Sequence, residues 1–150
     1  MRLEYWYLGD KQMKQLNPPL LEIDLPLAPP TNNLYSVVRG RKILSAAGRA
    51  YKREVGRILS NGFTWELIPP KTNLCFEAVF FIPKSSFYRR DLDGCLKCTI
   101  DAIFQGFKEM GAVDVNDNRI TELVCSKKRA EPDDLEGFCS VEISIANEGI

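Results

Sequence analysis

The stretch Asn73–Ile82, NLCFEAVFFI, is apolar, aromatic and β-branched, and this composition predicts a buried β-strand. A polar, basic loop over residues 83–90 separates it from a segment in which apolar residues recur every three or four positions. That spacing predicts a helix that runs to about Met110 and ends at Gly111. The residues on its apolar face are Leu92, Leu96, Ile100, Ile103 and Phe107.

Several shorter segments on either side of this unit have the composition or the alternation of strands. They are Leu21–Leu25, Leu34–Val38, Lys42–Leu44, Ile120–Lys128 and Phe138–Ala146. We expect the second and third of these to form a hairpin around Arg39-Gly40-Arg41, after an irregular loop at 28–33. An acidic turn at 131–134 separates the last two, which predicts that they pair antiparallel.

A second helix is predicted over Ala46–Ser60, with Ser45 as its N-cap. Its residues Ala47, Tyr51, Val55 and Ile58 recur at helical spacing, and we expect them to face the core. The resulting order of elements predicts a small single α+β domain with a mixed sheet and two main helices over residues 21–150. Residues 1–20 show no clear period and are interpreted as an N-terminal extension.

Composition limits the class of protein. The chain has 150 residues, of which 45% are apolar, enough for one domain with an ordinary core. Lys plus Arg and Asp plus Glu are 20 each, so any affinity for an anionic partner must come from a local basic patch. No apolar run is long enough to span a bilayer, and the opening lacks the apolar core of a signal peptide, which favours a cytoplasmic protein.

The chain contains no histidine, which excludes Ser-His-Asp and Cys-His catalysis and imidazole zinc sites. Any catalysis therefore depends on carboxylates, lysines or a metal held by oxygen, and oxygen ligands favour Mg²⁺ or Mn²⁺. The five cysteines are interpreted as reduced thiols. Cys95 and Cys98 form a C-x-x-C without a second pair, and their spacing favours packing on one helix face over metal or redox chemistry.

The start of the predicted helix that runs to about Met110 carries an unusual charge pattern, RRDLDGCLK, at 89–97. Asp91 and Asp93 fit the first turn of a helix, where free N–H groups favour negative charge. Asp93, Lys97 and Asp101 lie four residues apart, which is compatible with an ordinary ion-pair ladder. The same residues also fit a metal site that acts on phosphates, and the spacing alone leaves both interpretations open.

One phosphate-processing family with a related motif is the haloacid-dehalogenase-like phosphatases, whose first motif resembles D-x-D-G-T. In that family the first aspartate follows a buried strand directly. Here residues 85–90 do not have the composition of such a strand, and Cys95 replaces the threonine. The sequence disfavours this interpretation.

Four stretches follow one another in an order that carries more information than any single motif. They are PLAPPTNN at 26–33, SAAGRAY at 45–51, RDLDGCLKCTIDA at 90–102 and NDNRI at 116–120. This series resembles the RusA family of Holliday junction resolvases over roughly Leu21–Ile145. The family patterns are similar to P-x-x-P-P-[ST]-x-N, S-x-x-[GR]-x-x-Y, R-D-x-D-N-x-x-K-x-x-x-D-A and D-D-x-x-[IV].

The resemblance implies a RusA-like homodimer that resolves four-way DNA junctions by paired symmetrical nicks, in recombination and repair. It implies that Asp91, Asp93 and Asp117 hold Mg²⁺, for which Mn²⁺ would substitute, and that Lys97 stabilises charge on the phosphate. Each nick would leave a 5′-phosphate. Asp101 matches a recurrent family aspartate, and we expect it to support Lys97.

A junction resolvase of zero net charge needs a concentrated basic face. Cations gather in sequence before the acidic motif, and three arginines recur every four residues along the helix predicted at 46–60. The residues expected to contact DNA are Arg39, Arg41, Lys42, Arg49, Lys52, Arg53, Arg57, Lys84, Arg89 and Arg90.

Two positions depart from the family pattern. Gly94 replaces the asparagine after D-x-D, and Asn116 replaces the first residue of the later aspartate pair. The segment between Asp101 and Asp117 is also longer than usual. These departures leave a second hypothesis open, in which the chain binds branched DNA but has lost catalysis.

Overall fold

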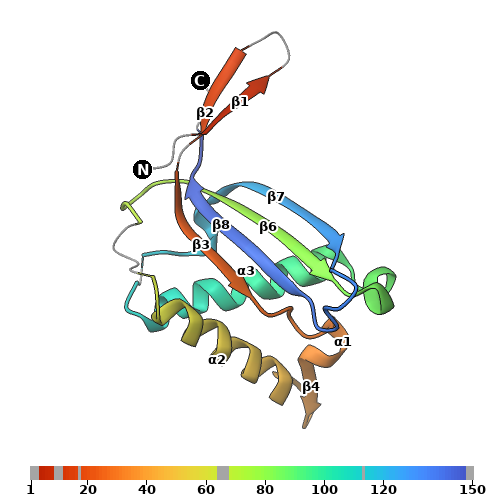
Figure 1. Cartoon of the computed structure of the whole chain (residues 1–150). Helices are drawn as coiled ribbons and strands as arrows, with labels where there is room; N and C mark the ends of the chain where they lie inside the picture. Colours follow the sequence, from red (N-terminus) through yellow and green to blue (C-terminus); the bar gives the residue numbers. More distant parts are fainter. Residues whose placement is uncertain (1–3, 9–11, 17, 64–67, 113, 148–150) are drawn as a thin grey trace.

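The computed structural model describes residues 4–8, 12–16, 18–63, 68–112 and 114–147 (Figure 1). It shows a small α+β domain built on a four-stranded mixed sheet, as the sequence predicts. The strands are β3 (Pro19–Leu25), β6 (Leu74–Ile82), β7 (Ile120–Arg129) and β8 (Phe138–Ile145). Their order in the sheet is β3-β8-β6-β7, with β6 and β7 parallel and the other pairs antiparallel.

The predicted antiparallel pairing of the last two strands is wrong, because β6 lies between β7 and β8. Burial explains the arrangement. Cys139, Val141 and Ile143 on β8 are completely buried, as an interior strand requires, whereas Leu123 and Val124 on β7 are half exposed and suit an edge. Pairing β8 with β7 alone would have left one edge of the apolar strand β6 unpaired.

The two long helices α2 (Ala46–Ser60) and α3 (Leu92–Glu109) lie against the same face of the sheet (Figure 1). Ser45 caps α2 as predicted, because its Oγ accepts a hydrogen bond of 3.1 Å from the Gly48 N–H. The expected core position Ala47 is wrong, since this residue is exposed. The buried positions of α2 are Gly48, Tyr51, Val55 and Leu59.

Inside the helix pair, the Tyr51 hydroxyl lies 3.3 Å from Thr99 Oγ1, and Thr99 also donates to the Cys95 carbonyl at 2.8 Å. Burial raises the pKa of Tyr51 above its usual range, so the hydroxyl stays neutral.

Smaller elements surround this core. Residues 31–33, expected in a loop, and Leu34, expected to begin a strand, form the single-turn helix α1 (Thr31–Leu34). The predicted hairpin is present as β4 (Tyr35–Val38) and β5 (Arg41–Leu44). Within the N-terminal segment, β1 (Glu4–Leu8) and β2 (Gln12–Leu16) pair as a separate two-stranded sheet that the sequence did not predict. In the described part of the chain, no helix is long and apolar enough to cross a membrane.

The connection from β7 to β8 passes the end of β6 closely, at Gly137. This residue has φ of 76°, and a Cβ placed there would lie 2.3 Å from the Phe81 carbonyl oxygen. Only glycine satisfies both the left-handed backbone and the close approach. The crossing that puts β8 on the other side of β6 therefore depends on this residue.

We expect Gly137→Ala to lower the free energy of unfolding by at least about 2 kcal/mol, because strain and the clash with the main chain add. Urea denaturation followed by circular dichroism measures the change. Gly62→Ala is the control, since a Cβ at Gly62 meets no atom within 4 Å. Equal unfolding midpoints for the two variants would contradict the assignment.

Candidate functional site

The D-x-D motif lies at the start of α3, directly after the 3₁₀ helix η2 (Lys84–Arg89). Asp91 is the N-cap residue, but its exposed carboxylate makes no capping hydrogen bond. Asp93 lies in the first turn and is exposed, and its Oδ1 accepts a bond of 2.9 Å from the Gly94 N–H. Helix capping therefore does not account for the side chain of Asp91.

Further along α3, Lys97 and Asp101 share a face with Asp93. Lys97 Nζ lies 3.9 Å from Asp101 Oδ2, and the two side chains are 79% and 37% exposed. A pair this open contributes little to stability. The ammonium lies beside a partly buried carboxylate and remains largely accessible to a ligand.

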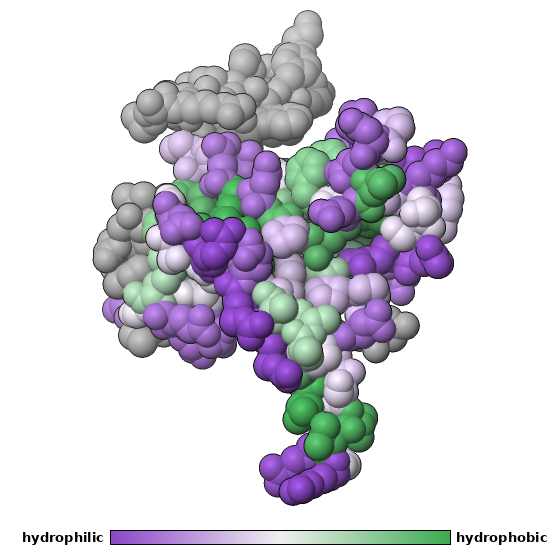
Figure 2. Space-filling model, turned by 60° about the horizontal axis from the view of Figure 1, so that its bottom comes forward, coloured by the Kyte–Doolittle hydropathy of each residue, from purple (hydrophilic) through white to green (hydrophobic). Residues whose placement is uncertain are grey.

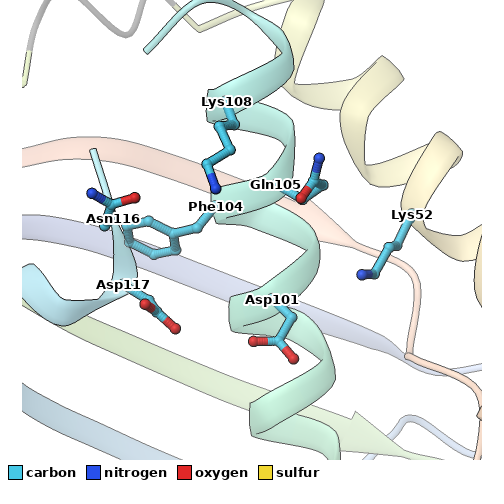
Figure 3. Close-up of a pocket in the computed structure, with 7 residues that line it drawn as sticks. All are labelled: Lys52, Asp101, Phe104, Gln105, Lys108, Asn116 and Asp117. Carbon is cyan, nitrogen blue, oxygen red and sulfur yellow. The ribbon is translucent and has the colours of Figure 1, made fainter. Parts of the chain in front are cut away.

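Asp117 comes from a distant part of the chain, at the start of the 3₁₀ helix η3 (Asp117–Arg119), and yet meets the same face of α3. It lines a hollow of about 230 Å³ together with Asp93, Lys97 and Asp101. A second hollow of about 220 Å³ shares Asp101 and Asp117 (Figure 3). Its other lining residues are Lys52, Phe104, Gln105, Lys108 and Asn116.

The two hollows therefore adjoin, and we call them together the acidic groove. Of the four residues expected to be catalytic, the structure brings Asp93, Lys97 and Asp117 together in this groove. The supporting residue Asp101 lines both hollows. Asp91 is not among the described residues that line these two hollows.

Sequence reasoning missed the residue that holds η3 in place. The Arg119 guanidinium donates to the Pro69 carbonyl at 2.6 Å, to the Thr72 carbonyl at 2.8 Å and to Thr72 Oγ1 at 2.8 Å. These bonds tie the turn that carries Asp117 to the loop before β6. Nothing in the local sequence around Arg119 indicates partners so far away along the chain.

A second missed residue, Lys127 on β7, holds the segment before Asp91. Its ammonium donates to the Phe87 carbonyl at 2.9 Å and to the Arg90 carbonyl at 3.1 Å, and lies 4.5 Å from the centre of the Phe87 ring. Arg90 in turn donates to the Ala28 carbonyl and contacts Cys95 Sγ at 3.6 Å. The D-x-D motif thus follows a segment fixed from two sides.

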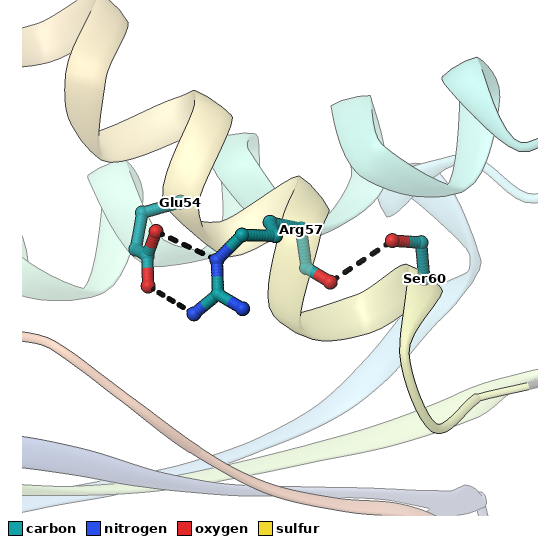
Figure 4. A network of polar contacts seen from close by, with 3 residues as sticks. All are labelled: Glu54, Arg57 and Ser60. Atoms are coloured by element: carbon teal, nitrogen blue, oxygen red, sulfur yellow. Dashed lines mark hydrogen bonds and ion pairs between the residues drawn. The ribbon is translucent and has the colours of Figure 1, made fainter.

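The ten residues expected to contact DNA fall in three places. The β4–β5 hairpin carries Arg39, Arg41 and Lys42, α2 carries Arg49, Lys52, Arg53 and Arg57, and η2 with its end carries Lys84, Arg89 and Arg90. Arg57 is already engaged, because its guanidinium donates to both carboxylate oxygens of Glu54 at 2.6 and 3.0 Å (Figure 4). That hydrogen-bonded pair lowers the pKa of Glu54.

The sheet face opposite the helices carries a row of acidic side chains. The register aligns Glu22, Glu142 and Glu77 as neighbours across β3, β8 and β6, on the side that alternates with the buried residues. Three carboxylates in a row disfavour a polyanion. The cations of α2 and of the β4–β5 hairpin, which are seven of the ten expected to contact DNA, lie on other parts of the domain.

The cysteines follow the packing interpretation. Cys95 and Cys98 are buried on α3, and burial, with Asp101 nearby, raises the pKa of the Cys98 thiol. Burial also raises the pKa of Cys139 to about 12. Thiols held protonated in this way are poor nucleophiles and poor metal ligands.

The donor set of the acidic groove fits a hard divalent cation, because its acidic groups are carboxylates and no histidine is present in the sequence. No preformed cage exists, however: across the residues that the structure describes, no three acidic or cysteine side chains come close enough to hold one ion. Mg²⁺ commonly binds one or two carboxylates and completes its shell with water and substrate phosphates, so the groove suits this ion without a cage.

The phosphatase interpretation fails on geometry. It requires the first aspartate to follow a buried strand directly, and here β6 ends at Ile82 and η2 intervenes before Asp91.

No family model matches the chain. Individual relatives do match: the crossover junction endodeoxyribonuclease RusA of Escherichia coli K12 is 30% identical over 105 residues, which is 70% of this chain and 84% of the relative. The proteins of the same name from Escherichia coli O1:K1 and Shigella sonnei Ss046 match with the same identity and coverage. The structure is an α+β domain whose groove brings carboxylates and lysines together. The identity and coverage shared with these relatives show that the chain belongs to the RusA family of crossover junction endodeoxyribonucleases.

The structure gives Lys127 a positioning role that can be tested without any assumption about activity. We expect Lys127→Met to increase amide hydrogen exchange in η2 and the first turn of α3, because two hydrogen bonds from a charged group are lost. The free energy of unfolding should fall by about 1–3 kcal/mol. Lys128→Met, at the exposed neighbouring position, is the control. Identical exchange in the two variants would show that Lys127 does not hold this segment.

Proposed function

We propose that this chain is a Mg²⁺-dependent endodeoxyribonuclease selective for branched DNA, which resolves Holliday junctions by paired symmetrical nicks with 5′-phosphate products. Membership of the RusA family supports the substrate class. The observation that carries the proposal is the convergence of Asp93, Lys97 and Asp117, from segments distant in sequence, on one hollow. An ion-pair ladder alone gives no reason for Asp117 to join it.

The ligands proposed for Mg²⁺ are Asp91, Asp93 and Asp117, of which Asp93 and Asp117 already line a common hollow. Mn²⁺ is expected to substitute. When bound, the ion would polarise the phosphodiester and lower the pKa of the attacking water. Asp101 also lines both hollows, so its carboxylate contributes to the negative potential that attracts the cation.

Lys97 provides the positive charge that this mechanism needs from the protein itself. Its ammonium is largely exposed beside the carboxylates and can donate to a phosphate oxygen on which charge develops. Asp101, at 3.9 Å, restricts where the ammonium lies, which gives this aspartate a positioning role. Lys52 and Lys108 line the adjoining hollow and would receive the phosphates on either side of the scissile one.

Two symmetrical cuts require two sites related by a two-fold axis, so we propose that the active form is a homodimer. A junction of four arms presents equivalent phosphates on opposite strands, and an isologous dimer matches that symmetry. Size-exclusion chromatography with light scattering at the concentration of the cleavage assay is the measurement that tests it.

The competing function is binding to branched DNA without catalysis. Gly94, Asn116 and the absence of a three-carboxylate cage among the residues that the structure describes favour it. The two functions predict the same DNA affinity and differ only in the chemistry, so a cleavage assay separates them.

We expect the wild type to cut a synthetic four-way junction in the presence of Mg²⁺, and Asp93→Asn to lose cleavage by at least about a hundredfold, because a proposed ligand of the ion that would polarise the phosphodiester is lost. Binding of the junction should be unchanged or tighter, because a negative charge near the phosphates is removed. The control is Asp114→Asn, an exposed aspartate outside both hollows. Denaturing gels of end-labelled strands measure cleavage, and fluorescence anisotropy measures binding.

Two results would count against the proposal. Tight, junction-selective binding with no cutting by the wild type in Mg²⁺ or Mn²⁺ would favour the non-catalytic function. Equal cleavage by Asp93→Asn and the wild type would remove Asp93 from the site.

The Glu54–Arg57 pair gives a separate test of where the DNA lies. Glu54→Gln removes a negative charge from α2 and releases Arg57, so we expect junction affinity to rise by roughly two- to fivefold at low salt, with a steeper salt dependence. Glu136→Gln, at an exposed position on the β7–β8 connection, should have no such effect. Unchanged binding by Glu54→Gln would place the DNA away from α2.

A further inference from the structure

The β4–β5 hairpin has a tight, well-defined end. Its strands pair in four rungs from Tyr35↔Leu44 to Val38↔Arg41, and Arg39 and Gly40 form the two-residue turn with φ of 51° and 75°. Positive φ at both central residues is the signature of a type I′ turn, whose twist matches that of the strands. We call residues 35–44 the ribbon.

The root of the ribbon is fixed to the body of the protein. Ser45 N–H donates to the Leu34 carbonyl at 2.8 Å, and its hydroxyl donates to the Asn33 carbonyl at 2.7 Å. The Arg49 guanidinium donates to the Leu44 carbonyl at 2.6 Å. Gly48 lies close under the same place, since a Cβ there would be 2.8 Å from the Leu44 side chain. The first turn of α2 therefore sets the direction of the ribbon.

Beyond this root the ribbon projects from the domain with apolar side chains on both of its faces. By the register, Val37 lies on the face of Tyr35 and Lys42, and Val38 and Ile43 lie on the other. Val37 is 75% exposed, Val38 47% and Ile43 40%. Figure 2 shows the projection, green along its length and purple at its tip. An isolated two-stranded ribbon is marginally stable in water, so apolar residues on both faces indicate a partner that encloses it.

The charge of the ribbon identifies the chemistry of that partner. Residues 35–44 contain three cations, Arg39, Arg41 and Lys42, and no acidic residue. A second copy of the chain docked ribbon to ribbon would bring six such charges together and would cover one face only. A nucleic acid offers phosphates for the cations and, where stacking is interrupted, apolar base faces on two sides.

We propose that the ribbon inserts at the branch point of junction DNA. Val37, on one face, and Val38 and Ile43, on the other, contact base faces that the interrupted helix exposes, while the cations bind the phosphates on either side. The inference rests on the proposed function, and adds that selectivity for branched over linear DNA comes from this apolar insertion. A linear duplex has no open step, so the apolar contacts form only at a junction.

The experiment uses the full chain without divalent metal, so that no cutting occurs, and measures binding to a four-way junction and to a linear duplex of the same length. The test variant is Val37→Thr/Ile43→Thr, which changes one residue on each face and keeps β-branched side chains. The control variant is Leu123→Thr/Val124→Thr, which changes half-exposed residues on β7. A junction with 2-aminopurine at the branch reports unstacking directly.

The ribbon variant is expected to bind the junction about tenfold more weakly, to bind the duplex within about twofold of the wild type, and to lose the 2-aminopurine signal, because the apolar contacts with unstacked bases are removed. The control should match the wild type. Arg39→Gln/Arg41→Gln should instead weaken both DNAs and reduce the salt slope by about two. Circular dichroism and light scattering on each variant confirm the fold and the oligomeric state.

The outcomes separate the two proposals. A wild type that binds junction and duplex equally overturns the proposed function, and the ribbon proposal with it. A wild type that prefers the junction while the ribbon variant keeps that preference overturns the ribbon proposal alone. A ribbon variant whose oligomeric state changes shows that the ribbon contacts a second copy, which also overturns it.

Discussion

The structure depends on the burial of β6 beneath α3. Leu74, Phe76, Phe80 and Ile82 are inaccessible to solvent on one face of the strand, and Ile103 and Phe107 of the helix are equally buried. A parallel partner must then be reached through a crossover, so the chain passes from β6 through η2 and α3 to η3 and β7. This path returns Asp117 to the side of the helix that carries Asp93 and Lys97. The acidic groove is therefore a consequence of packing a crossover helix on an apolar strand.

The same packing separates the charges of a neutral chain. One face of the sheet is covered by helices, whose outer surfaces and neighbouring hairpin carry most of the cations expected to contact DNA. The uncovered face carries the row Glu22, Glu142 and Glu77. Zero net charge is thus compatible with an oriented electrostatic field, because the sum over the chain says nothing about which face each group occupies.

Sequence periodicity predicted the elements well and their neighbours poorly. The strand at 74–82, the helix at 92–109 and the hairpin around Arg39-Gly40 follow from local pattern and turn chemistry, which act within a few residues. The position of β8 between β3 and β6 does not follow from local pattern. It depends on which strand order buries the most apolar surface when the sheet assembles. Lys127 and Arg119 were missed for the same reason: their partners are main-chain carbonyls about 40 residues or more away. The motif series pointed to Asp93, Lys97 and Asp117, but the place of Asp101 in both hollows, and of Asp91 outside them, emerges only from the folded backbone.

An incomplete metal cage and an exposed lysine have a consequence for selectivity in the proposed mechanism. Carboxylates that do not form a closed set bind Mg²⁺ weakly, because the ion retains its water unless enough anionic oxygens replace it. A phosphate seated in the groove supplies the missing oxygens and at the same time meets Lys97, whose ammonium is largely free beside Asp101. The competent site would then exist only while DNA is in place, and DNA stays in place longest where it gains the most contacts. Recognition of the branch and assembly of the catalytic centre would thereby be one coupled event, and the protein would need no separate device to prevent nicking of linear DNA.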